Sequence, residues 1–84
     1  MNTKDWIITW FTKNTVAHIS DIEKNTRQDY FVQNWIDSLK FITLITDIEE
    51  HFHIVFANDE FQNREFSTID GLVKIIEGKI NDKI

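Results

Sequence analysis

Residues 37–52 read DSLKFITLITDIEEHF, and this stretch decides the fold. Asp37 and Ser38 both favour the capping position of a helix, so the stretch predicts a helix that starts abruptly at one of them and runs to about Phe52. Its apolar residues recur at helical spacing and are expected to share one face. They are Leu39, Ile42, Ile45, Ile48 and Phe52.

Two further long helices are predicted, one on each side of this stretch. Upstream, Asn2 or Thr3 can cap a helix over Thr3–Asn14, whose apolar positions again have helical spacing. Downstream, Ser67 or Thr68 can cap a last helix that carries Asp70 in its first turn. The residues on its expected buried side are Leu72, Val73, Ile75, Ile76 and Ile80.

The connections between these helices differ in length. Residues 15–34 are mostly polar and predict a long ordered loop, in which Ser20 and Glu23 have the spacing that caps one short turn. Residues 58–63 predict a short helix, and Phe61 and Phe66 are expected to anchor the chain that follows it. The expected fold class is therefore all-α: a small four-helix bundle with three longer helices, one short helix and a long first loop.

Composition limits the possible functions. The 84 residues contain no proline and two glycines, and they predict a single domain over residues 1–84. The absence of cysteine excludes a disulfide framework and a thiolate metal site. A net charge of −5 with scattered basic residues argues against a nucleic-acid partner and suits a partner with a basic face. No signal peptide or membrane span is visible, which predicts a cytoplasmic protein.

Residues 35–42, WIDSLKFI, resemble the phosphopantetheine attachment site of the acyl carrier protein family, which has Asp-Ser-Leu at the start of its second helix. Three downstream features match the same family: an apolar run that ends in Glu49, Phe52 and Ile54, the acidic pair Asp59 and Glu60 of a short third helix, and residues 66–69 at the opening of the last helix. The resemblance covers roughly residues 30–80 and implies a bundle of acyl-carrier type.

The resemblance also implies a function. Ser38 would carry a covalent 4′-phosphopantetheine arm whose thiol holds an acyl or aminoacyl group as a thioester. Asp37 would help to position a metal ion and the serine while a phosphopantetheinyl transferase attaches the arm. The other expected partners are a loading enzyme, either an adenylation enzyme or an acyltransferase, and downstream biosynthetic enzymes. Such a carrier performs no bond chemistry, so the chain is not expected to be an enzyme or to hold its own metal.

One departure from the family pattern narrows the pathway. The family has a glycine two or three residues before the aspartate, and here these places hold Trp35 and Asn34. Asn is the best substitute for glycine in a left-handed backbone conformation, which favours the longer spacing. That spacing resembles the D-alanyl carriers and the stand-alone carriers of specialised pathways. We expect a monomeric carrier for nonribosomal peptide, polyketide or D-alanyl transfer.

The helix after Ser38 is expected to contact partner enzymes. Its carboxylates would face a basic partner surface, although an ordinary solvated helix face explains any one of them equally well. Phe41 has a core position as its alternative, and Ile42, Ile45 and Ile48 are expected in the core more than beside the cargo. The candidate partner-recognition residues are Trp35, Leu39, Lys40, Phe41, Asp47, Glu49 and Glu50.

Other chemistries fit the sequence less well. His51 and His53 are two residues apart and do not face each other on a helix, so no metal site is predicted. A hydrolase that used Ser38 lacks the strained Gly-x-Ser-x-Gly turn. Two alternatives remain: a helical interaction module of the same fold that is never modified, and a small acidic inhibitor or toxin partner.

Overall fold

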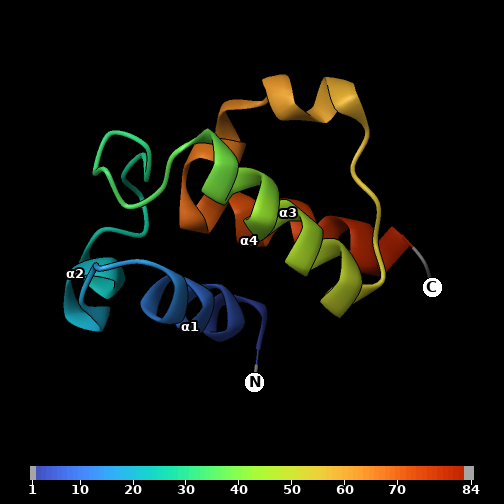
Figure 1. Cartoon of the computed structure of the whole chain (residues 1–84). Coiled ribbons are helices and arrows are strands. Elements are labelled where there is room, and N and C mark those ends of the chain that lie inside the picture. Colours follow the sequence, from blue (N-terminus) through green and yellow to red (C-terminus); the bar gives the residue numbers. More distant parts are fainter. Residues whose placement is uncertain (1, 83–84) are drawn as a thin grey trace.

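The structure is a computed structural model that describes residues 2–82, so the predicted domain ends at residues 1 and 84 lie outside the described part. Its elements are four α-helices and two short 3₁₀ helices, and residues 2–82 contain no strand. In chain order they are α1 (Thr3–Asn14), α2 (Ile19–Lys24), α3 (Ser38–Phe52), η1 (Asn58–Gln62), η2 (Arg64–Ser67) and α4 (Ile69–Asp82). Figure 1 shows α3 passing in front of α4, with α1 below them and η1 and η2 above.

The three long helices form where the sequence predicts them. In α1, the Asn2 side chain accepts the backbone N–H of Asp5 at 2.8 Å, which identifies Asn2 as the cap. In α4, the Thr68 hydroxyl accepts the N–H of Gly71 at 3.0 Å, so Thr68 rather than Ser67 provides the cap. The all-α bundle with three longer helices and one short helix is confirmed.

Two short elements differ from the prediction. The long first loop contains the helix α2, which begins at Ile19, so the predicted cap at Ser20 is wrong and Ser20 lies inside the helix. His18 precedes this helix without capping it through its side chain. The short helix predicted for residues 58–63 is a single 3₁₀ turn, η1, and a second such turn, η2, follows it.

The core is a continuous cluster of apolar side chains from all four helices and the connections. Nine of them are almost fully buried: Ile7, Phe11, Ile22, Tyr30, Leu44, Ile48, Ile69, Leu72 and Ile76. The predicted buried face of α3 is partly wrong, because Leu39 and Ile42 are 76% and 61% exposed. Leu44, Ile45 and Ile48 form the buried side of α3 instead.

Tyr30 connects the long loop before α3 to the segment that leads into α4. Its buried hydroxyl donates a hydrogen bond to the carbonyl of Phe66, and its backbone N–H donates to the carbonyl of Ser67 at 2.9 Å. Burial raises the pKa of the Tyr30 hydroxyl, so this group stays a neutral donor. The loop before α3 is therefore held against the start of α4.

Charged side chains add two further connections. The Asp70 carboxylate, at the start of α4, receives Lys4 of α1 at 2.9 Å and the hydroxyl of Thr26 at 3.2 Å. The Glu60 carboxylate accepts the N–H of Ala57 at 2.8 Å and an ion pair from Lys79 at 2.7 Å. The backbone hydrogen bond, and then Lys79, lower the pKa of Glu60. These contacts join α1 and η1 to α4.

Gly71 lets η2 lie directly against the first turn of α4. A methyl group added at Gly71 would approach the Cα of Glu65 to 2.7 Å, closer than side-chain carbons normally come to backbone. The second glycine of the helix, Gly78, has open space around it. The two glycines of α4 therefore have different roles.

We expect Gly71→Ala to lower the free energy of unfolding by about 1–3 kcal/mol, because η2 must move away from α4. Gly78→Ala is the matched control in the same helix and should raise it by about 0.5–1 kcal/mol, since alanine is the better helix former. Urea unfolding followed by circular dichroism measures both. Equal effects of the two substitutions would contradict the close approach of η2.

Candidate functional site

Ser38 is the first residue of α3, and its side chain is exposed. Asp37 caps the helix: its Oδ1 accepts the N–H of Lys40 at 2.8 Å, and its carbonyl accepts the N–H of Phe41 at 2.9 Å. Of the two predicted caps, Asp37 and Ser38, the structure identifies Asp37. The Ser38 hydroxyl is left accessible on a rigid helix end.

The chain approaches Ser38 through a tight loop. Asn34 has a φ of 61°, so the predicted left-handed residue is Asn34, which supports the longer of the two spacings. The N–H of Asn34 donates to the carbonyl of Phe31 at 3.0 Å, and that of Trp35 donates to the carbonyl of Tyr30 at 3.1 Å. These bonds turn the backbone from the Tyr30 anchor directly into α3.

A shallow hollow of about 230 Å³ lies beside Ser38 and is lined by Asn34, Trp35, Ile36, Asp37 and Lys40. The amides of Ser38 and Leu39 are in the first turn of α3, where no intrahelical acceptor exists, and such amides favour a phosphate. Lys40 adds an exposed positive charge in the same turn. An exposed hydroxyl and first-turn amides without intrahelical acceptors fit a phosphate-linked group on Ser38.

The carboxylates of α3 are not equally available. Asp47 Oδ2 accepts the indole N–H of Trp10 at 2.8 Å, and Glu49 Oε2 accepts the N–H of Phe56 at 3.0 Å. Both are half-buried, whereas Glu50 is exposed. Two of the three acidic candidates on α3 therefore connect it to α1 and to the segment after it.

The other candidate recognition residues also include exposed residues and residues that are partly packed against the core. Leu39 and Lys40 are exposed next to Ser38. Trp35 is half-buried, with its ring 6.0 Å from that of Phe11. Phe41 is half-buried, and its ring lies 5.3 Å from that of Phe31. The structure thus places Leu39 and Lys40 on the surface and uses Trp35 and Phe41 partly for packing.

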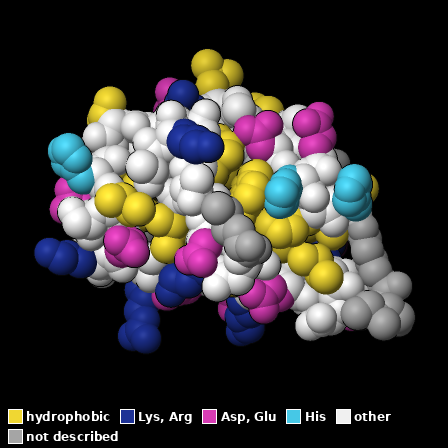
Figure 2. Space-filling model, turned by 90° about the horizontal axis from the view of Figure 1, so that it is seen from below, with side chains coloured by type: hydrophobic (Ala, Val, Ile, Leu, Met, Phe, Trp, Pro, Cys, Tyr) yellow, Lys and Arg dark blue, Asp and Glu magenta, His cyan; other side chains and the backbone are white. Residues whose placement is uncertain are grey.

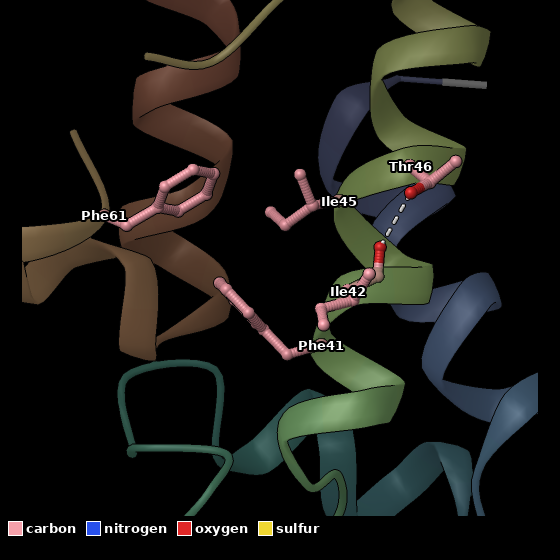
Figure 3. A pocket seen from close by; sticks show the side chains of 5 residues that line it. All are labelled: Phe41, Ile42, Ile45, Thr46 and Phe61. Atoms are coloured by element: carbon pink, nitrogen blue, oxygen red, sulfur yellow. Dashed lines mark hydrogen bonds between the residues drawn. The ribbon is translucent and has the colours of Figure 1, made fainter. Parts of the chain in front are cut away.

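An apolar cavity of about 270 Å³ lies between α3 and η1, and sequence reasoning did not predict it. Figure 3 shows Phe61 of η1 pointing across it towards α3. Phe61 was expected only as an anchor, and nothing in its spacing indicates a cavity wall, because the wall forms from two distant segments. The lining residues are Phe41, Ile42, Ile45, Thr46 and Phe61.

Charge is mixed on the face of the molecule that Figure 2 shows. Acidic and basic side chains alternate there, with hydrophobic side chains between them, and neither sign forms a continuous patch. Within residues 2–82, no group of three or more His, Asp or Glu side chains is arranged to hold a metal ion. No helix in the same residues is both long enough and apolar enough to cross a bilayer.

Comparison with known proteins gives relatives of similar length. An acyl carrier protein homolog from Mycoplasmopsis pulmonis is 32% identical over 79 residues, which cover 94% of this chain and 97% of the relative. D-alanyl carrier proteins from two subspecies of Streptococcus equi, zooepidemicus and equi, are each 30% identical over 77 residues, covering 92% of this chain and 94% of the relative. No protein-family model and no solved structure matches the chain.

The bundle of three long helices and one short helix has the architecture of a small all-α carrier-type protein. The relatives identify the family: this chain belongs to the acyl carrier protein family, and its role is that of a carrier protein.

The left-handed conformation at Asn34 generates a test of the loop. We expect Asn34→Ala to lower the free energy of unfolding by about 1 kcal/mol, since alanine tolerates a positive φ less well than asparagine, whereas Asn34→Gly should keep or raise it. Gln33→Ala, at the exposed neighbouring position, is the control and should change little. Thermal unfolding of the three variants measures the difference, and an Asn34→Ala variant as stable as Gln33→Ala would contradict the assigned backbone conformation.

Proposed function

We propose that Ser38 is the attachment site of 4′-phosphopantetheine and that the chain carries an acyl or aminoacyl group as a thioester on that arm. The observation that carries the proposal is the exposed hydroxyl of Ser38 at the first position of α3, directly after the capping residue Asp37. Membership of the acyl carrier protein family supports the same residue, because the family's attachment motif matches residues 37–39.

The chain's own residues hold and present the arm. Transfer from coenzyme A joins Ser38 Oγ to phosphorus, releases the nucleotide part of coenzyme A, and passes the hydroxyl proton to a base of the transferase. The first-turn amides of α3 would stabilise the phosphodiester charge of the attached arm. Asp37 keeps the helix start fixed through the hydrogen bond from the N–H of Lys40, and its carboxylate would help to position the transferase's metal ion. When attached, the arm supplies a thiol that forms the thioester.

Partners follow from this chemistry. A phosphopantetheinyl transferase attaches the arm, a loading enzyme of the adenylation or acyltransferase class charges the thiol, and downstream enzymes of a specialised pathway receive the cargo. The pathway transfers D-alanyl groups, nonribosomal peptides or polyketides, and the similarity to D-alanyl carrier proteins favours the first. The chain acts as a single cytoplasmic carrier domain without catalytic activity of its own.

Intact mass spectrometry tests the attachment site. After incubation with coenzyme A, magnesium and a broad-specificity phosphopantetheinyl transferase, the wild-type chain should gain about 340 Da, the mass of one arm. Ser38→Ala should gain nothing. Ser20→Ala is the matched control, because Ser20 is also an exposed serine in the first turn of a helix, and it should be modified like the wild type.

No mass change in the folded wild-type chain, with a second transferase also tried, would refute the carrier reading of Ser38 and favour an unmodified interaction module. A gain that persists in Ser38→Ala would place the arm elsewhere.

Substitutions of Asp37 distinguish its role in the stability of α3 from its role in the modification of Ser38. Asp37→Asn keeps a side-chain oxygen that caps α3, so the melting temperature should stay close to that of the wild type, whereas Asp37→Ala should cost about 1 kcal/mol. Both variants lack the carboxylate charge and should be modified roughly tenfold or more slowly by the transferase. Initial rates of mass gain, set beside thermal melts, check this, and an Asp37→Asn variant that is modified at the normal rate would reduce Asp37 to a helix cap.

A further inference from the structure

Trp35 is a large side chain near Ser38 that neither the fold nor the proposed function fully explains. Asn34 takes the left-handed conformation, so the backbone does not require a particular residue at position 35. The Trp35 ring is half-buried, with its centroid 6.0 Å from that of Phe11. Its indole N–H is not buried and makes no hydrogen bond within residues 2–82, whereas the indole N–H of Trp10 is bonded. Trp35 therefore offers ring surface and a hydrogen-bond donor beside Ser38.

The hollow of about 230 Å³ beside Ser38 has a mixed surface. Its lining combines apolar side chains with amide, carboxylate and ammonium groups, on Asn34, Trp35, Ile36, Asp37 and Lys40. Asp37 and Lys40 lie on either side of Ser38 in the sequence. A group bonded to Ser38 Oγ therefore begins at the edge of this hollow.

The backbone beside the hollow has hydrogen-bonding groups that the protein does not use. The N–H of Trp35 is bonded within the loop, and the next bonded N–H is that of Lys40, which donates to Asp37 Oδ1 at 2.8 Å. Within residues 2–82, the N–H groups of residues 36–39 have no acceptor, and the carbonyls of residues 34–36 have no donor. Asp37 is extended, with φ −109° and ψ −173°. Extended backbone can pair with the amides of another chain.

We propose that this hollow holds the 4′-phosphopantetheine arm of Ser38 between encounters with enzymes, with the arm's methyl groups against the Trp35 ring and its amides bonded to the backbone of residues 34–37. The inference rests on the proposed function, and it deepens that proposal by giving the arm a binding site on the carrier itself. The arm carries geminal methyl groups, a hydroxyl and two amides, which match the mixed surface of the hollow. The first-turn amides of α3 remain available to the phosphate.

The apolar cavity between α3 and η1 fits the arm less well. Its lining is apolar except for Thr46, and the Thr46 hydroxyl already donates to the carbonyl of Ile42 at 2.9 Å. An amide that moves from water into such a cavity loses its hydrogen bonds without replacing them, which is unfavourable. In the hollow beside Trp35, the amides of the arm keep partners.

A weak contact is sufficient, because the arm is covalently attached to the carrier. A short flexible tether gives an effective concentration on the order of millimolar, so a contact with a dissociation constant of about 1 mM fills the hollow about half of the time. An enzyme that binds the thiol end can then withdraw the arm with only about a twofold loss of affinity. The site therefore holds the arm without preventing its transfer to an enzyme.

NMR of the holo carrier tests the site. An isotope-labelled chain is modified with unlabelled coenzyme A by a broad-specificity phosphopantetheinyl transferase, and isotope-filtered spectra detect NOEs between arm and protein. The arm's methyl groups should show NOEs to the Trp35 ring. Hydrogen exchange of the amides of Ile36 and Asp37 should slow roughly twofold or more relative to the unmodified chain. The amide of Val55, which lies beyond the other end of α3 and is 78% exposed as a residue, is the control and should exchange equally in both forms.

Trp35→Ala separates contact with the hollow from the charge of the phosphodiester, because its holo form carries the same phosphate. It should lose the NOEs and the slowed exchange. Trp6→Ala is the matched control at a second half-buried tryptophan, which stacks on His51, and it should keep both. Circular dichroism checks the folding of the two variants, and if Trp35→Ala is unfolded, the NOEs of the wild type decide alone.

Two results would overturn the inference. NOEs from the arm to Phe41 and Phe61 would place it in the cavity, and an arm without NOEs to the protein would be free in solution. In both cases the mass gain of the wild type would leave the proposed function intact. A wild-type chain that gains no mass would overturn both proposals.

Discussion

The hydrogen bond from the buried Tyr30 hydroxyl to the Phe66 carbonyl is the constraint on which the site depends. Residues 25–37 form no helix or strand, so turn bonds within the segment and a few bonds to the start of α4 must satisfy their backbone groups. Tyr30 provides a buried ring, a hydroxyl donor, an N–H bonded to Ser67 and a carbonyl that accepts the N–H of Trp35. Together with the two hydrogen bonds between Thr26 and Asp70, Tyr30 places the loop that leads into α3 relative to α4. Removal of the hydroxyl would leave a buried carbonyl without its donor, which costs more than the bond itself contributes.

Aromatic side chains help the buried Leu44, Ile45 and Ile48 to hold the position of α3. The Trp10 indole bonds to Asp47, and Trp6 stacks on His51 with ring centroids 4.7 Å apart. At the other end, Phe41 contacts the ring of Phe31 in the loop. Large aromatic side chains fill the space between α3 and its neighbours. With smaller side chains, the helix would have to lie closer to them. The proposed attachment of an arm to Ser38 requires such an arrangement, since the side of α3 next to this serine must then stay free for partners.

The sequence was sufficient for features that depend on neighbouring residues. The spacing in residues 3–14 and a cap at Asp37 or Ser38 follow from local rules, and the structure confirms the spacing and identifies Asp37 as the cap. The left-handed Asn34 was expected from the glycine position of the family pattern, and the structure agrees. The sequence was insufficient for features that depend on tertiary contacts. Helical spacing grouped Leu39 and Ile42 with Ile45, but the period of a pattern does not fix which part of a broad apolar stripe meets the core. The six-residue α2 carries no side-chain cap that would reveal it. The hydrogen bond of Asp47 depends on Trp10, which is distant in sequence, and that of Glu49 depends on how the chain folds back after the end of α3 to bring the N–H of Phe56 to it.

The net charge of −5 and the exposed apolar side chains of α3 act at different ranges and do not conflict. A net charge influences how partners approach, and in physiological salt its effect decays over a Debye length of about 8 Å. Contact is decided at shorter range by the side chains that lose water, and near Ser38 these are Leu39, Ile42 and the charged Lys40. A carboxylate that already bonds an indole or a backbone N–H has little capacity left for a partner, although it still counts towards the net charge. For this reason the composition of a carrier helix indicates the sign of long-range attraction, whereas the hydrogen bonds within the fold determine which groups remain for recognition.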